Sequence, residues 1–428
     1  MGLRITGVDR LLVDIPFYDV PERNMARHTG SWHIAEVCRV KSDGGLVGFG
    51  ETMPNYTWGR VSDAAVARVI GKQPAECMWD DSLGAGLQMA LFDLAGKAAG
   101  VPVYRLLGQK VRDWCPLSWW CIDMPAEDMA AEAARAVELG YTAHKQKARP
   151  WFDVVEQVRQ TTAVIPENFS LDLDFNGHLV NAASAVPVLK ELDTFRNVQL
   201  YESPIPQGDV AGNQRLRSQT RCGIAMHYGA PPIMTALREQ VCDGFVVSGG
   251  ASAVQRQAAV AHEANMPFWL QLVGTGITTT MAMHLGAVCS HAQWPAVTCV
   301  NMFQHQLLRQ PIVVKGGYVR VPETPGLGIE IDEAALQTYR TNTTEHQERP
   351  VIYGIHRANG DITYFASEHD AGSGPPHGYW EDNALGNLPA YERGTRLEAR
   401  YDDGTPEWQD LRRRLQEAPI RSHGSERV

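Results

Sequence analysis

The sequence predicts an α/β protein in which a parallel (β/α)8 barrel of the TIM type follows a smaller α+β domain. Short apolar runs recur along the middle of the chain, and their ends lie 21 to 28 residues apart. Helix-like stretches separate the runs, and strands that alternate with helices pair in parallel. Eight such units close into a barrel. The runs end at Cys121, Lys147, Asp174, Glu202, His227, Ser248, Leu272 and Val300.

Residues 1–112 do not follow this repeat. Strand-like alternation covers Ile5–Val13, Ala35–Val40 and Leu46–Thr52, and a helical pattern covers Leu83–Ala99. We therefore expect a separate α+β domain in front of the barrel.

The barrel is expected over residues 113–310. Its clearest helix runs from 125 to 139, where apolar residues recur every three or four positions before Gly140. An open doubly wound sheet is the alternative, but no Gly-rich dinucleotide fingerprint follows the first run. Residues 311–341 return to strand-and-turn character. Residues 342–428 are rich in Gly, Pro, His and charge, so we expect an extension wrapped on the surface or at a subunit contact, without assigned chemistry.

Composition limits the possible partners. The chain has 428 residues, a net charge of −10 and no basic stripe, which disfavours nucleic acid. No apolar run reaches the roughly 18 residues that a membrane span needs. The start has no pattern of a secretory signal, and the eight cysteines contain no CxxC pair. A cytoplasmic protein with reduced thiols is the simplest interpretation.

Charged side chains stand at the predicted C-terminal ends of neighbouring strands, where barrel enzymes carry their catalytic groups. Lys145 and Lys147 are two residues apart, so they face the same side of their strand. Two buried ammonium groups lower each other's pKa, and a lysine near neutrality can act as a base. Asp174 and Glu202 follow on the next two strands and offer hard oxygen ligands for Mg²⁺.

These four side chains predict a reaction class. A metal would neutralise the enolate that forms when a lysine removes the α-proton of a carboxylate substrate. Taken singly, a Lys-x-Lys pair is usually a solvated strand edge, and an acidic residue at a strand end is usually solvated or caps a helix. Their occurrence on three consecutive strands, one repeat apart, favours the functional interpretation.

Several motifs, in this order, resemble those of the enolase superfamily, in its mandelate racemase and muconate lactonizing enzyme branch. The resemblance covers about residues 3–340, and its motifs are specific as a set rather than singly. They are Ala90–Gly108, Lys145-Gln-Lys147, Asp174-Phe-Asn176, Tyr201-Glu-Ser-Pro204, Met283-His-Leu-Gly286 and Pro325-Gly-Leu-Gly328.

The resemblance implies a capping domain, a (β/α)7β-type barrel, and a closing segment over residues 311–341 that returns to the cap. It also implies a divalent metal, usually Mg²⁺, a small carboxylate substrate, and a homo-oligomer, either dimer or octamer. Lys147 would be the base, Lys145 would tune it or contact the substrate carboxylate, and Asp174 and Glu202 would bind the metal. Cap-loop residues would help to set specificity, unless they form an ordinary exposed loop; they are Arg27, His28, Trp32 and Tyr56. Asn176, Tyr201, Gln271 and Asn301 are further candidates for substrate binding.

The sequence departs from the family at the third metal ligand. The segment 225–229 has no carboxylate, and His227 and Tyr228 occupy the positions that two branches of the family use. His227 is a candidate ligand or acid/base, or a histidine that fills the barrel mouth. A water, another metal, or no metal are the alternatives. Strand seven offers Gln271 in place of a histidine, and strand eight offers Asn301 in place of a glutamate.

The base on the opposite face of a two-base racemase is thus missing. A one-sided site favours β-elimination of water, so we predict a lyase that dehydrates an acid sugar. His227, Tyr228 and Tyr201 are the candidate acids for the departing hydroxide. A racemase, epimerase or cycloisomerase of the same superfamily is the first alternative, and a non-catalytic binding protein on the same fold is the second.

Overall fold

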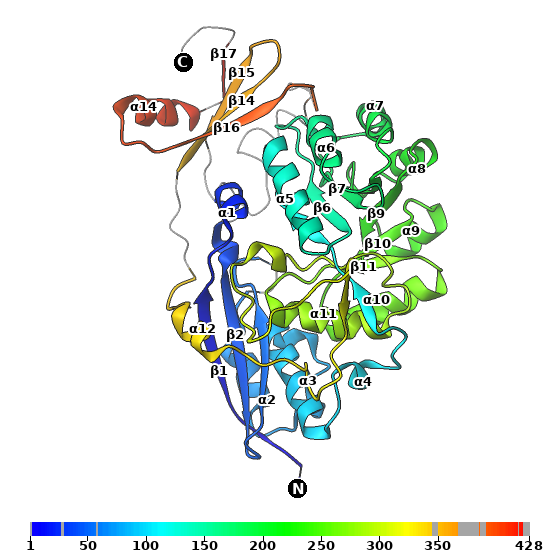
Figure 1. Cartoon of the computed structure of the whole chain (residues 1–428), viewed down its shortest axis with the longest axis vertical. Helices are drawn as coiled ribbons and strands as arrows, with labels where there is room; N and C mark the ends of the chain where they lie inside the picture. The colour runs from blue at the N-terminus through cyan, green and yellow to red at the C-terminus, as the bar shows by residue number, and fades with distance from the viewer. Residues whose placement is uncertain are drawn as a thin grey trace.

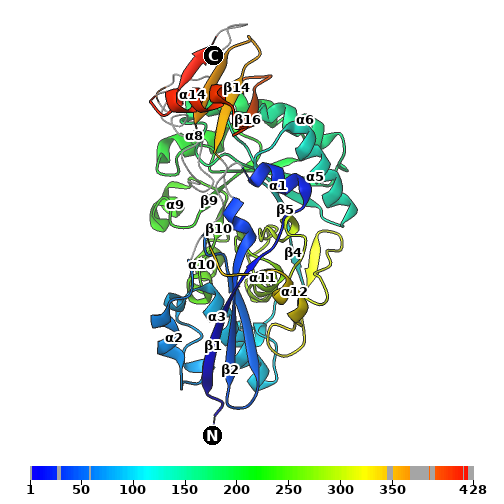
Figure 2. The same cartoon turned by 90° about the vertical axis from the view of Figure 1, so that its left-hand side faces the viewer.

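The computed structural model describes residues 2–26, 30–56, 59–344, 350–366, 385, 391–417 and 419–422. Figure 1 shows three parts: a cap that contains the N-terminal strands, a barrel, and a C-terminal module at the end of the molecule opposite the N-terminus. The same division is visible after a quarter turn (Figure 2).

The barrel wall is a sheet of seven parallel strands that follow one another in sequence order. Residues 296 and 297 occupy the eighth position of the wall. Ala296 forms a single bridge with Leu117, just before the first strand, and Val297 forms one with Gln271, just after the last strand. The strands are β5 (Trp119–Cys121), β6 (Ala143–Lys147), β7 (Ser170–Asp174), β8 (Val198–Glu202), β9 (Gly223–His227), β10 (Gly244–Val247) and β11 (Phe268–Leu270). The predicted α/β barrel is therefore confirmed.

The prediction of an eighth strand that ends at Val300 is wrong. Val300 begins a short 3-10 helix, η4 (Val300–Met302), and Cys299 before it has a left-handed φ of 60°. The bridge at Val297 ends the extended segment before this turn. The apolar character of Val300 reflects burial rather than strand geometry, which periodicity alone does not separate.

Helices cover the outside of the wall. Three of them begin at a side chain that accepts a backbone N–H of the first turn, namely Asp153, Asn181 and Asp209. α11 is buried over nearly its whole length, because the barrel lies on one side of it and the cap on the other. The helices are α5 (Ala126–Glu138), α6 (Val154–Thr162), α7 (Ala182–Leu192), α8 (Val210–Gln219), α9 (Ile233–Glu239), α10 (Ala251–Glu263) and α11 (Gly276–Val288).

The cap is an antiparallel sheet with the order β13-β1-β2-β3, backed by α3 (Ala85–Ala99). Glycine is required in β3, because a Cβ on Gly48 would lie 2.1 Å from the carbonyl oxygen of Ala90. The edge strand β13 comes from the segment after the barrel, which therefore returns to the cap. The strands are β1 (Ile5–Asp14), β2 (Ile34–Ser42), β3 (Val47–Thr52) and β13 (Arg340–Thr341), and the smaller helices are α1 (Asp19–Met25), α2 (Asp63–Val69) and α12 (Glu333–Thr338).

Carboxylates of the cap bind the N-termini of two barrel helices. Glu51 is fully buried; one of its oxygens accepts the backbone N–H groups of Thr275 and Thr278 at 2.6 and 2.8 Å, and the other accepts the Thr275 hydroxyl. Asp81 accepts the backbone N–H groups of Ser252 and Ala253 at the start of α10. Free N–H groups and the helix dipole favour a negative charge there, so these contacts hold the cap on the barrel.

The C-terminal extension was expected to wrap on the surface, but its described part folds into a module with its own core. Four antiparallel strands pair in the order β16-β14-β15-β17, and α14 packs on the sheet. The elements are β14 (Val351–His356), β15 (Ile362–Ala366), β16 (Arg396–Tyr401), β17 (Ile420–Ser422) and α14 (Pro406–Leu415). Trp408, Leu411 and Leu415 of the helix cover Ile352 and Ala366, so this region is an additional small α+β unit.

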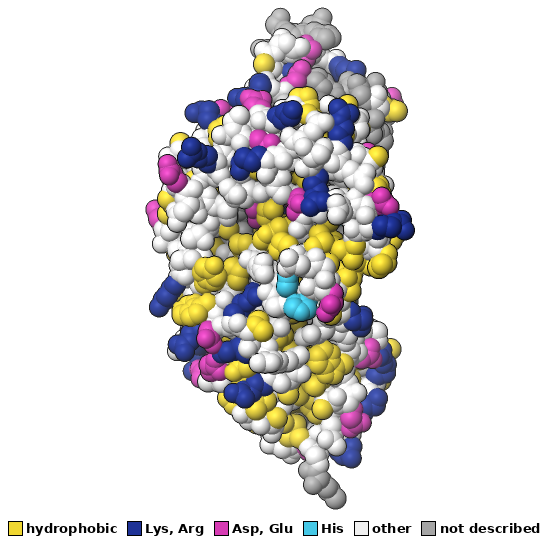
Figure 3. All heavy atoms as spheres, turned by 90° about the vertical axis from the view of Figure 1, so that its right-hand side faces the viewer, with side chains coloured by type: hydrophobic (Ala, Val, Ile, Leu, Met, Phe, Trp, Pro, Cys, Tyr) yellow, Lys and Arg dark blue, Asp and Glu magenta, His cyan; other side chains and the backbone are white. Residues whose placement is uncertain are grey.

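All eight cysteines are free and buried. Figure 3 shows a face of the molecule on which basic and acidic side chains are interspersed. Over the described ranges, no helix combines the length and the apolar character that crossing a bilayer would require.

Replacing Glu51 with alanine should destabilise the joint between cap and barrel. The change leaves two buried N–H groups and a hydroxyl without their acceptor, which corresponds to about 3 kcal/mol of unfolding free energy. Urea unfolding monitored by tryptophan fluorescence measures the loss. Asp63→Ala removes an exposed cap carboxylate and should change the midpoint little; equal midpoints for the two variants would contradict the proposed joint.

Candidate active site

Four charged side chains meet at the C-terminal ends of β6, β7 and β8. The strand register pairs Lys147 with Asp174 and Asp174 with Glu202, which puts the three at one level of the barrel. Lys145 is two residues before Lys147 and faces the same interior. All four side chains are nearly buried, with at most 10% of the side-chain surface exposed. The structure therefore brings together the two lysines and two acids that the sequence predicted.

Lys145 lies between the two acids. Its ammonium pairs with Glu202, lies 3.3 Å from Asp174 Oδ2, and donates a hydrogen bond to Gln271 Oε1 at 3.2 Å. Burial disfavours the charged amine, but the charges of Glu202 and Asp174 outweigh burial and raise the pKa of Lys145. Lys145 is therefore a fixed cation of the site.

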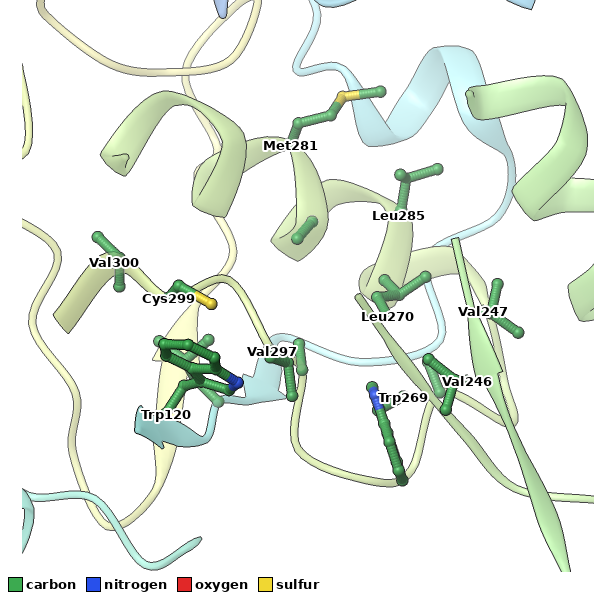
Figure 4. Close-up of a cluster of buried hydrophobic side chains, with 14 of the residues drawn as sticks. Trp120, Val246, Val247, Trp269, Leu270, Met281, Leu285, Val297, Cys299 and Val300 are labelled. Carbon is green, nitrogen blue, oxygen red and sulfur yellow. The ribbon is translucent and has the colours of Figure 1, made fainter. Parts of the chain in front are cut away.

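A tryptophan ring forms the floor below this ammonium. Lys145 Nζ lies 5.4 Å from the centre of the Trp269 ring, within range of a cation–π interaction. Trp120 and Trp269 lie on either side of Val297 in the buried cluster, with Val246 and Leu270 beside them (Figure 4). The apolar floor excludes water from below, which strengthens the electrostatic interactions at the mouth.

Lys147 has the opposite electrostatic balance. Its Nζ is 2.5 Å from Asp174 Oδ2 and donates to Asn176 Oδ1 at 2.9 Å. Burial is the largest effect, and together with the nearby cations Lys145 and Arg149 it outweighs the attraction of Asp174, so the pKa of Lys147 is lowered. Of the two lysines, Lys147 is the one that can lose its proton and accept another.

Arg149 is a site residue that the sequence interpretation missed. Its guanidinium is fully buried, donates to Asn176 Oδ1 at 2.7 Å, and donates to the backbone carbonyl of Asp174 at 3.1 Å. Asn176 Oδ1 thus accepts from both Lys147 and Arg149. The signal was present, because Arg149 continues the two-residue alternation of Lys145 and Lys147 beyond the strand end.

The acid pair fits a divalent cation in part. Both carboxylate oxygens of Glu202 are buried and accept no well-aligned hydrogen bond, although they face Lys145 and His227 Nε2, the latter at 3.0 Å. Two carboxylates with water and substrate oxygens are a sufficient ligand set for Mg²⁺. Within the described ranges, no three carboxylate, imidazole or thiol groups surround one point. Asp174 and Glu202 therefore offer two oxygen donors of the kind that Mg²⁺ takes, and in this structure both are paired with lysines.

Aromatic residues of the cap approach the barrel interior from above. The Trp32 ring stacks on Trp120 with centroids 5.8 Å apart and contacts the Tyr56 ring at 3.9 Å. Burial raises the pKa of Tyr56 above its usual range, and the charges of Lys145, Glu202 and Asp174 also act on it. Trp32 and Tyr56 thus form a wall over the site, whereas Arg27 and His28 lie outside the described residues.

Three other predicted residues lie around or away from this centre. Tyr228 packs edge-on against Phe245 beside the mouth. The Tyr201 hydroxyl donates to the backbone carbonyl of Leu189 on α7, so this side chain faces the helices and not the barrel interior. Both ends of the Asn301 amide bond the backbone of Trp120 at 2.9 and 3.1 Å. Asn301 therefore supports the first strand, and no part of its amide is directed to a substrate.

Comparisons with known proteins agree with this architecture. A family model described as mandelate racemase / muconate lactonizing enzyme, N-terminal domain, matches residues 14–108. A model described as enolase C-terminal domain-like matches residues 128–335. Together they cover the cap and the barrel, and neither reaches the C-terminal module.

Characterised relatives are distant. An N-succinyl-L-Arg/Lys racemase of Bacillus cereus is 24% identical over 334 residues, which are 70% of this chain and 89% of the racemase. A D-galactonate dehydratase of Ralstonia nicotianae is 26% identical over 371 residues, 73% of this chain and 92% of the dehydratase. The crystal structure of a muconate lactonizing enzyme from Pseudomonas fluorescens, complexed with muconolactone, superimposes with a TM-score of 0.66 at 22% identity, covering 80% of this chain and all of that one.

The relatives include dehydratases, racemases and cycloisomerases, so family membership does not select one reaction. What they share with this chain is the capped barrel, and here that barrel carries paired lysines and paired acids at its mouth. The chain belongs to the enolase superfamily, in its mandelate racemase and muconate lactonizing enzyme branch.

Proposed function

We propose that this protein removes the α-proton of a small carboxylate substrate with Lys147, and that the overall reaction is the dehydration of an acid sugar. The observation that carries the proposal is the unequal pair of buried lysines. Lys145, between two acids, stays a cation, whereas burial and neighbouring cations lower the pKa of Lys147. A base and a fixed positive charge thus face the same interior side of one strand.

The steps follow from these two roles. Lys147 Nζ takes the α-proton, and the electron pair of the C–H bond moves into the carboxylate to form an enolate. The Lys145 ammonium stabilises the negative charge that develops there. Asp174 and Glu202 would hold a Mg²⁺ ion, which supplies Lewis-acid stabilisation of the same charge. The enolate then expels hydroxide from the β-carbon, and the resulting enol becomes a 2-keto-3-deoxy acid.

The departing hydroxide needs a proton from an acid. His227 is the first candidate, because its imidazole is about two-fifths exposed at the mouth and its Nε2 lies 3.0 Å from Glu202. Tyr228 is the second. Tyr201 cannot fill this role, since its hydroxyl donates to the Leu189 carbonyl of α7 on the outside of the wall.

Elimination is favoured over racemisation by the side chain at the end of β11, where a second base would be expected. Gln271 lies at the end of β11 and accepts a hydrogen bond from Lys145, and an amide cannot serve as a base. Exchange of configuration needs proton donors or acceptors on both faces of the enolate. Solvent deuterium entering the substrate without loss of water would instead support the racemase or epimerase alternative, and absence of any bound divalent metal would support a non-catalytic protein.

Lys147→Ala should abolish turnover, since a positioned general base contributes about 10²- to 10⁴-fold to the rate. Release of 2-keto-3-deoxy acids from a panel of aldonic and uronic acids with Mg²⁺ measures this. Lys190→Ala, at an exposed position of α7, is the matched control and should retain activity. Unchanged turnover in Lys147→Ala would remove it as the base, and products with only inverted configuration would exclude dehydration.

The pH profile should reveal the lowered pKa of Lys147. A base acts in its neutral form, so kcat/KM should rise with pH through a pKa below the ordinary lysine value. Arg149→Met removes a cation that lowers this pKa, so the rising limb should move to higher pH. A limb that stays in place or moves to lower pH would show that Arg149 does not act on the base.

Metal content tests the acid pair independently of turnover. Asp174→Asn and Glu202→Gln should each lose the divalent metal bound by the wild type, because each removes one of two charged oxygen ligands. His227→Ala should lose less, since imidazole is a poor ligand for Mg²⁺. Elemental analysis after dialysis against Mg²⁺ gives the stoichiometry, and full occupancy in Glu202→Gln would contradict this assignment.

A further inference from the structure

The C-terminal module rests on the loop that follows β6. Trp151 and Phe152 of this loop are buried together with Ile355, Phe365 and Leu397 of the module. Figure 1 shows the module above the ends of α5 and α6, on the side of the barrel where β6 and β7 lie. The module thus contacts the loop at the C-terminal end of β6, the strand that carries Lys145 and Lys147.

Polar contacts also join the C-terminal module to the loop after β6. The backbone N–H of Asp153 donates to the Thr395 carbonyl at 2.9 Å, and the N–H of Gly394 donates to Asp153 Oδ2 at 2.7 Å. Arg393 pairs with Asp153 at 3.1 Å and with Glu191 of α7 at 2.6 Å. One guanidinium therefore joins the module to both the loop and the next helix.

A further contact reaches closer to the reacting groups. The Tyr391 hydroxyl donates to the carbonyl of Ala148 at 3.2 Å, and its ring packs edge-on against Phe175 with centroids 5.5 Å apart. Ala148 is the residue directly after Lys147, and Phe175 directly follows Asp174. Tyr391, buried to 7% exposure, therefore touches the neighbours of the predicted base and of a predicted metal ligand.

The loop itself carries Arg149 into the site. Arg149 stands between Ala148, which Tyr391 holds, and Trp151, which the module buries. Its guanidinium shares Asn176 Oδ1 with Lys147. The backbone N–H of Ala148 also donates to the Asp174 carbonyl, so a shift of this loop moves several groups together.

We propose that the C-terminal module is a working part of the active site, in which Tyr391 and Arg393 are positioning residues that hold the 148–153 loop so that Arg149 and Lys147 keep their places on Asn176 and Asp174. This inference rests on the proposed role of Lys147. Neither family model includes the module, so this support is an addition to the shared cap-and-barrel frame. The alternative is a module that adds stability without affecting the site.

Four substitutions in the full-length protein separate these possibilities. Arg393→Ala removes both ion pairs, and Arg393→Lys is the conservative rescue. Tyr391→Phe removes the hydroxyl bond to Ala148 and keeps the ring. Arg413→Ala is the matched control, because it removes an arginine from the same module, and among the described residues Arg413 pairs with Asp410 within α14.

The measurements are backbone hydrogen exchange over residues 148–153, the rate at which a small acylating reagent labels Lys147, and kcat and KM separately. Arg393→Ala should speed exchange in the loop, change the labelling rate of Lys147, and lower kcat by about 10- to 100-fold with little change in KM, since a displacement of about 1 Å can cost that much. Arg393→Lys should recover part of the loss, Tyr391→Phe should show a smaller loss, and Arg413→Ala should behave as the wild type.

Two results would overturn the inference. Loop exchange and Lys147 labelling in Arg393→Ala that match Arg413→Ala would show that the module does not order the site. A loosened loop with unchanged kcat would show that the ordering has no catalytic effect. If the wild type turns over no member of the acid panel, the proposed reaction fails, and the labelling of Lys147 alone decides whether the module positions it.

Discussion

The site depends on burying three cations and two carboxylates at the ends of three neighbouring strands. Removing a charge from water costs several kcal/mol, so such groups persist only where partners surround them. Lys145 bridges Glu202 and Asp174, and Asp174 also pairs with Lys147. The pairing is unequal, because Lys145 faces both acids whereas Lys147 faces one acid and a second cation, Arg149. In the proposed reaction, that inequality makes Lys145 the fixed charge and Lys147 the base.

The rest of the fold keeps these groups from relaxing apart. Parallel register sets Lys147, Asp174 and Glu202 at one height, and Trp269 closes the space below them. From above, the cap is held by carboxylates such as Glu51, which binds the N-terminus of α11. Fixing the cap in this way also fixes Trp32 and Tyr56 over the mouth. The charged groups are thus held by rigid strands, whereas the surface that covers them belongs to a docked domain. This division allows one type of barrel to serve many substrates.

The sequence predicted the parts of this structure that follow from local periodicity. Strand ends at Lys147, Asp174 and Glu202 were correct, because the strands recur at a regular spacing along the chain. Val300 was misassigned, since burial in a 3-10 turn and burial in a strand give the same apolar pattern. Tyr201 was predicted wrongly although alternation excludes it, because it directly precedes the inward-facing Glu202 on the strand and must face the other way. Asn301 lies in the 3-10 turn, where strand alternation no longer fixes the direction of a side chain. Arg149 and the module contacts needed three-dimensional information, because their partners lie 25 to 243 residues away.

The cap and the C-terminal module differ in how they can influence the proposed reaction. Trp32 and Tyr56 form the aromatic contact of the cap with Trp120 of the barrel, and in the proposed function they help to decide which substrate fits. The C-terminal module instead contacts the loop after β6, through Tyr391 at Ala148 and Arg393 at Asp153. The Tyr391 ring also packs on Phe175, directly after β7. Under the proposal made above, changes there alter how firmly Lys147 and Arg149 are held. Substrate choice and the strength of the base would then depend on separate parts of the chain, and each could vary while the central charges of the barrel stay the same.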